Sequence, residues 1–89
     1  MPGTLHIFRL QSNPVQYQVN YNLAANSWVQ VFTPQGLEEF LRHSSGLAVP
    51  DVDAMLSELR ADNHTTQTDV EIGESHLGEM GFAESPSDE

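Results

Sequence analysis

Residues 15–33 constrain the fold more strongly than any other part of the chain. The first half of this stretch, V-Q-Y-Q-V-N-Y-N, alternates strictly between apolar or aromatic residues and side-chain amides. Because successive side chains of a strand point to opposite faces, the pattern predicts a strand with one buried face and one amide face. The second half, S-W-V-Q-V-F-T, is β-branched and aromatic, and the four residues L-A-A-N between the halves predict a hairpin.

A further strand is predicted before this hairpin, at residues 4–11. Its sequence, T-L-H-I-F-R-L-Q, places apolar residues on both parities, which favours a central strand or one covered on both faces. The S-N-P sequence that follows is a turn signal, so the first two strands are expected to pair tightly. Three consecutive strands then form an antiparallel meander.

Two amphipathic helices are predicted after the meander. Residues 33–43 begin with Thr33 as the N-cap and Pro34 at the first helical position, where its missing N–H costs nothing. Residues 50–62 repeat apolar side chains at i, i+3, i+4 and i+7, which is one stripe of a helix. The loop between them is short, so the two helices are expected to form an αα-hairpin over one face of the sheet.

The C-terminal third is less regular. Residues 65–72, T-T-Q-T-D-V-E-I, predict a fourth strand at an edge of the sheet, although the pattern does not say beside which strand. Residues 73–82 mix glycines, acids and isolated apolar residues and predict an irregular arm, while residues 83–89 predict a disordered acidic tail. The predicted fold class is therefore α+β, with the order β-β-β-α-α-β in one small domain over residues 1–82.

The charge of the chain is divided unevenly along its length. The net charge is −10, from 13 acidic residues and only three arginines, with no lysine. Residues 1–37 contain no acid and carry +1 from Arg9, whereas residues 38–89 carry −11. Three cations are too few for the many phosphate contacts of nucleic-acid binding or for an anionic membrane surface. Two interpretations of the acidity remain, namely solubility and a negative surface that is complementary to a protein partner with a basic surface.

Several functional classes have no support in the sequence. The chain has no cysteine, which excludes disulfides, a thiolate nucleophile and Cys-based metal sites. It lacks nucleotide-binding, hydrolase and zinc-protease motifs, so an enzyme and a bound cofactor are not expected. Without a long apolar run, a cytoplasmic location is the expectation.

The amide face of the second strand is the first candidate contact surface. Gln16, Gln18, Asn20 and Asn22 form a neutral row in a region without acids or lysines to protect a strand. Three interpretations remain open, namely a solvated face, strand addition by a partner, and pairing with a second copy in a homodimer. Trp28 has two interpretations, a core residue or a surface anchor for such a partner, since tryptophan is rarely fully buried and is enriched at the centres of interfaces.

The acidic helices are the second candidate surface. The carboxylates expected to protrude from them are Glu38, Glu39, Asp53, Glu58 and Asp62. They motivate an alternative hypothesis, an inhibitor of the phage or immunity type that mimics nucleic acid and occupies a basic cleft. The leading hypothesis is a small, non-enzymatic regulatory or adaptor protein that acts by binding another protein.

A metal-dependent enzyme is the third and least supported hypothesis. It rests on the sequence E-S-H-L-G-E, in which His76 and Glu79 are the nearest candidate ligands. A metal site needs a rigid frame and usually a second imidazole. Solvated charges are therefore the favoured interpretation of this segment, and no metal ligand is predicted.

Overall fold

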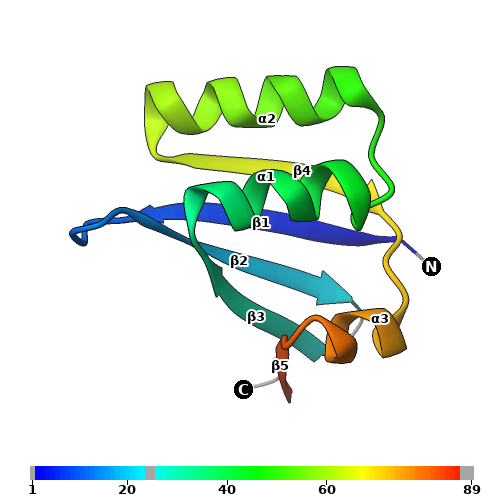
Figure 1. Cartoon of the computed structure of the whole chain (residues 1–89). Helices are drawn as coiled ribbons and strands as arrows, with labels where there is room; N and C mark the ends of the chain where they lie inside the picture. Colours follow the sequence, from blue (N-terminus) through cyan, green and yellow to red (C-terminus); the bar gives the residue numbers. More distant parts are fainter. Residues whose placement is uncertain (1, 24–25, 87–89) are drawn as a thin grey trace.

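The computed structural model describes residues 2–23 and 26–86 and places five strands and three helices in them. In chain order these are β1 (Gly3–Leu10), β2 (Gln16–Leu23), β3 (Asn26–Phe32), α1 (Pro34–His43), α2 (Val49–Asp62), β4 (His64–Val70), α3 (Glu74–Glu79) and β5 (Ala83–Pro86). The strands form one antiparallel sheet in the order β4-β1-β2-β3-β5 (Figure 1). The predicted α+β class, with a three-stranded meander, two helices and a fourth strand, is confirmed.

The register of the meander decides which face of each strand is buried. On β2, Val19 lies opposite Ile7 of β1, and Tyr21 lies opposite Leu5 of β1 and Trp28 of β3. All five of these side chains are buried in the hydrophobic core. The odd-numbered residues of β2 therefore face the core, as the alternation predicts.

The two long helices cover one face of the sheet. Thr33 caps α1, because its hydroxyl accepts a 3.1 Å hydrogen bond from the amide of Gly36. The helix α2 ends at Asn63, which has the left-handed φ of 63° that terminates many helices. Figure 1 shows α1 and α2 side by side over the sheet, with α1 packed on β2 and β3 and α2 packed on β1 and β4.

The structure settles where the fourth strand lies and which of the two alternatives holds for β1. The strand β4 pairs with β1 at one edge of the sheet, so β1 is an interior strand. It is covered on one face only. Leu5 and Ile7 are fully buried, whereas 37% of Phe8 is exposed on the other face.

The C-terminal segment is more ordered than predicted. The irregular arm expected at residues 73–82 contains the helix α3, whose Leu77 is fully buried. Gly81 then turns the chain with a φ of +91°, and Phe82 packs against Phe32 and Phe40 at ring-centroid distances of 5.9 and 5.6 Å. Residues 83–86, expected to be disordered, form β5 beside β3. The rest of the expected tail, residues 87–89, lies outside the described residues.

Among the helices of residues 2–23 and 26–86, none is both long enough and apolar enough to cross a membrane.

Candidate interaction surface

The face of the sheet that points away from the helices forms the candidate surface. No described helix lies over it, because α1 and α2 cover the opposite face (Figure 1). The short helix α3 packs on that same opposite face through Leu77 and Met80. The carbonyl of Met80 also accepts a hydrogen bond from the side chain of Gln30. We call this surface the open face. The residues of β1, β2, β3 and β4 that lie opposite one another on this face are Thr4, His6, Phe8, Leu10, Gln16, Gln18, Asn20, Asn22, Ser27, Val29, Val31, His64 and Thr66.

The amide row lies on the open face, on its central strand. The side-chain amide of Gln18 donates a 3.0 Å hydrogen bond to Oδ1 of Asn20, and Gln16 continues the row toward the hairpin turn. The backbone of β2 pairs with β1 on one side and β3 on the other. A partner strand therefore has no free edge to join at this row, which excludes the strand-addition interpretation for β2.

Apolar side chains flank the amide row on both sides. Gln18 lies opposite Phe8 of β1 and opposite Val31 of β3, so these three residues form one row across the sheet. The exposed fractions of Phe8 and Val31 are 37% and 41%. The two residues are thus large hydrophobic side chains left in contact with solvent on either side of a neutral amide.

A cluster of aromatic rings extends the open face toward its β4 edge. The ring of Phe8 stacks on that of His64 with the ring centroids 4.7 Å apart, and the ring centroids of His6 and His64 are 6.2 Å apart. The Thr66 hydroxyl is 3.3 Å from both Nδ1 of His6 and Nε2 of His64. Sequence reasoning missed this cluster, because the sequence pattern did not indicate beside which strand the fourth strand lies. The shared parity of His6 and Phe8 was the available signal.

The open face carries no formal charge. None of the open-face residues is an aspartate, glutamate, lysine or arginine. Acidic residues instead mark the two edge strands. Asp69 adopts a φ of 59° where the register of β4 shifts, and Glu84 of β5 accepts a 2.8 Å hydrogen bond from Asn26. A bulge and edge acids are devices that discourage strand pairing at a sheet edge.

Trp28 does not belong to the open face. It lies opposite Tyr21 and points into the core, where only 5% of it is exposed. Its indole N–H is buried without a hydrogen-bond partner among the described residues. The interpretation of Trp28 as a surface anchor is therefore wrong, because the parity of β3 sends residues 26, 28, 30 and 32 to the helix side.

Some carboxylates of the acidic helix surface are already bound by other side chains of the same protein. Arg42 on α1 forms 3.0 Å ion pairs with Glu38 on the same helix and with Asp53 on α2. Hydrogen bonds from Arg42 to these two carboxylates raise the pKa of its guanidinium above the usual value. Glu58 is also engaged, since its carboxylate accepts a hydrogen bond from the Thr65 hydroxyl. Only Glu39 and Asp62 of the five predicted acids are exposed without such a described contact.

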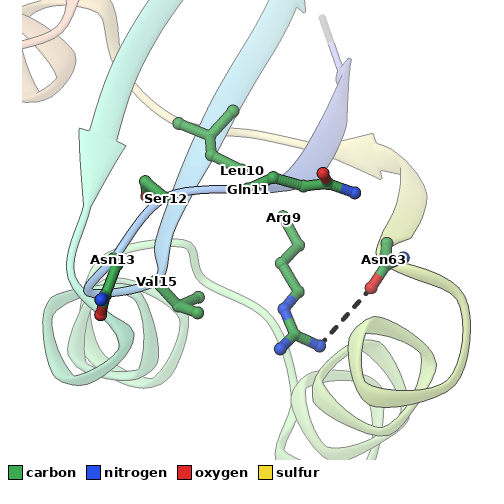
Figure 2. A pocket seen from close by; sticks show the side chains of 7 residues that line it. All are labelled: Arg9, Leu10, Gln11, Ser12, Asn13, Val15 and Asn63. Atoms are coloured by element: carbon green, nitrogen blue, oxygen red, sulfur yellow. Dashed lines mark hydrogen bonds between the residues drawn. The ribbon is translucent and has the colours of Figure 1, made fainter.

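A solvent-open pocket of about 530 Å³ lies where the β1–β2 turn approaches the end of α2 (Figure 2). Arg9 is its cation, and Nη1 of Arg9 lies 3.5 Å from Oδ1 of Asn63, as the dashed line in Figure 2 marks. The backbone amide of Arg9 also donates a 2.9 Å hydrogen bond to the Asn63 carbonyl. Arg9 thus lies beside the carboxyl end of α2, where a positive charge complements the helix dipole. Its position has a structural explanation.

The segment considered for the metal-site hypothesis, residues 74–79, forms the helix α3. Nδ1 of His76 lies 3.8 Å from Oε1 of Glu79, one helical turn away, and both side chains are exposed. Across residues 2–23 and 26–86, no group of three or more histidine, aspartate or glutamate residues is arranged to hold a metal ion.

Comparison with known proteins adds nothing to this geometry. No protein-family model, curated protein or solved structure matches the chain.

Proposed function

We propose that this chain is a small, non-enzymatic regulatory protein that acts by binding a protein through its open face. The observation that carries the proposal is that a neutral sheet face with exposed Phe8 and Val31 is covered by none of the described helices, in a chain of net charge −10. Exposed hydrophobic side chains that share one face and are bordered by polar residues commonly mark contact sites.

The composition of the open face supports a protein as the partner. Depletion of charge with enrichment of aromatic side chains is typical of the centre of a protein–protein interface. The amides of Gln18 and Asn20 can both donate and accept hydrogen bonds, so they suit a polar protein surface. The rigid sheet beneath them holds these groups in place before binding, which lowers the entropic cost of association.

The nucleic-acid-mimic hypothesis has weaker support. Mimicry needs free carboxylates that protrude in an array, yet Arg42 binds two of the five predicted acids and Thr65 binds a third. A basic cleft would first have to displace these internal partners. The open face needs no such rearrangement.

An affinity experiment with matched baits tests the proposal. The wild-type chain, the Gln18→Glu/Asn20→Asp variant and the Gln35→Glu/Ser57→Glu variant are each immobilised and exposed to lysate of the source organism. Both variants add two negative charges, but the second pair lies on exposed positions of α1 and α2. We expect the open-face variant to lose the proteins that wild-type and control baits retain. Equal capture by all three baits would contradict the proposal.

Salt dependence separates this proposal from mimicry. Binding at an uncharged face should change little between low and high ionic strength, whereas a charge-mimicking inhibitor should dissociate as salt rises. Reversal of Glu39 and Asp62 to lysine should leave open-face binding intact. A steep salt dependence, together with loss of capture in the lysine variant, would favour the mimic.

A further inference from the structure

We infer that the partner at the open face is a second copy of this chain, stacked face to face so that helices cover both outer sides of a two-sheet core. The inference rests on the proposed function, because it takes the open face as the contact surface and names its occupant. Three properties of that face lead to a copy rather than to an unrelated protein.

The first property is the distribution of charge. Each copy carries −10, so two copies repel one another wherever their acidic surfaces approach. Stacked sheets lie about 10 Å apart, and α1 and α2 lie on the far side of each sheet (Figure 1). The helix acids of the two copies are then separated by both sheets, well beyond the Debye length of about 8 Å at physiological salt. Face-to-face stacking is therefore the arrangement in which the acidic helices repel least.

The second property is self-complementarity. A closed dimer uses the same patch on both subunits, related by a two-fold axis. An axis that runs along β2 above Gln18 exchanges the two sides of the sheet. Phe8 on β1 of one copy is then brought over Val31 on β3 of its partner, while Gln18 meets its own equivalent. Apolar side chains meet apolar side chains, and an amide meets an amide, which can donate to it and accept from it.

The third property is the protection of the sheet edges. A copy that paired edge to edge would have to join β4 or β5. The strand β4 has a register shift with Asp69 in a left-handed conformation, and β5 has only four residues. Both features disfavour strand pairing at an edge. Stacking through the open face avoids both edges.

The size of the face indicates the strength of the contact. Four strands at a spacing of about 4.8 Å and seven residues at a rise of about 3.3 Å cover roughly 19 Å by 23 Å. This area is below the approximately 800 Å² that each partner contributes to a standard interface. The dimer should accordingly be reversible and should depend on concentration, rather than being obligate.

Analytical ultracentrifugation of the purified chain over a wide concentration range tests the inference. We expect a monomer–dimer equilibrium whose dissociation constant rises by about tenfold or more in Gln18→Glu and in Val31→Lys. Val31→Lys is decisive, because it lowers the net negative charge. If net charge alone governed association, this variant would dimerise better than wild type. Gln35→Glu on α1 is the control and should change the dissociation constant little.

Cross-linking gives a second measurement, which reports the proximity of the two copies rather than a loss of affinity in a variant. The chain has no cysteine, so each introduced thiol is unique. Because the stacked sheets lie about 10 Å apart, Gln18→Cys should form a short intermolecular bis-maleimide cross-link much faster than Glu39→Cys on the exposed side of α1. Circular dichroism and the urea midpoint establish that each variant is folded.

The outcomes distinguish the inference from the proposed function. A strict monomer at all concentrations, with equal cross-linking at positions 18 and 39, overturns the inference. If open-face baits nevertheless lose their captured proteins under those conditions, the proposed function stands with a different partner. A monomer whose captured proteins ignore the open-face substitutions overturns both.

Discussion

The hydroxyl of Tyr21 donates a 2.6 Å hydrogen bond to the carbonyl oxygen of Val70, although β1 lies between their two strands. The hydroxyl oxygen of Tyr21 in turn accepts a 3.3 Å hydrogen bond from the backbone amide of Ile72. Gly3 on β1 leaves room for this reach, since a Cβ there would lie 2.7 Å from Cζ of Tyr21. One buried phenol thus ties the centre of the sheet to the chain that leaves β4.

Removal of this hydroxyl should destabilise the fold. Tyr21 is fully buried, so Tyr21→Phe leaves the Val70 carbonyl and the Ile72 amide without their buried partner. An unsatisfied buried polar group costs about 1–3 kcal/mol, and we expect the free energy of unfolding to fall by that amount. Urea denaturation measures it. Tyr17→Phe, at a half-buried position, is the control and should cost less. An unchanged urea midpoint for Tyr21→Phe would show that water replaces the hydroxyl.

The turn at Gly81 should be sensitive to any side chain. Its φ of +91° is unfavourable for an L-residue, and a Cβ would lie 2.7 Å from Nε2 of Gln30, which donates to the Met80 carbonyl. Gly81→Ala should therefore loosen β5 and Phe82 and lower stability by roughly 1–2 kcal/mol. Hydrogen exchange at the β3–β5 pairs reports the loosening.

Gly78 provides the matched control for Gly81. It lies inside α3, and a Cβ there meets no atom within 4 Å. Gly78→Ala should leave β5 in place and should stabilise α3 by about 0.5–1 kcal/mol, because alanine is the better helix former. Equal loss of protection in both variants would point to a general weakness of the C-terminal segment rather than to the turn.

The two long helices begin differently, which predicts substitutions of opposite sign. Thr33 caps α1 through its hydroxyl, so Thr33→Ala should lower stability by about 1 kcal/mol. Ala48 occupies the N-cap of α2 and provides no side-chain cap. Ala48→Ser should raise stability by a similar amount, about 1 kcal/mol, since its hydroxyl can accept a bond from the Asp51 amide. Thermal melts of both variants measure the difference. A destabilised Ala48→Ser would show that the loop excludes the extra oxygen.

The ion pairs of Arg42 should contribute a salt-dependent increment of stability. Arg42→Gln releases Glu38 and Asp53, which then repel one another across the α1–α2 interface. We expect a lower urea midpoint at low ionic strength and a smaller difference at high salt, because exposed charges are screened. Arg60→Gln removes the same charge from α2 without touching these pairs. An equal salt dependence in both variants would assign the effect to net charge alone.

Local patterns were sufficient to predict most of the fold. The alternation in β2, the N-cap at Thr33 and the apolar stripes of α1 and α2 are properties of neighbouring residues, and each was confirmed. The amide row was predicted to oppose the apolar face of β2, and the structure places it there. The uneven distribution of charge along the chain likewise follows from the composition of its two halves alone.

Long-range contacts decided the rest. The position of β4 beside β1, the pairing of residues 83–86 with β3 and the burial of Trp28 all depend on partners far away in the sequence. Isolated apolar residues beside glycines form no periodic pattern, so the sequence did not indicate that Leu77 and Phe82 are buried. The helix α3 and the turn at Gly81 direct these two side chains into the core. The sequence determined that β2 has an uncharged amide face. Only the tertiary structure showed that no helix of the described residues covers this face, because the three helices found there pack on the other side of one sheet.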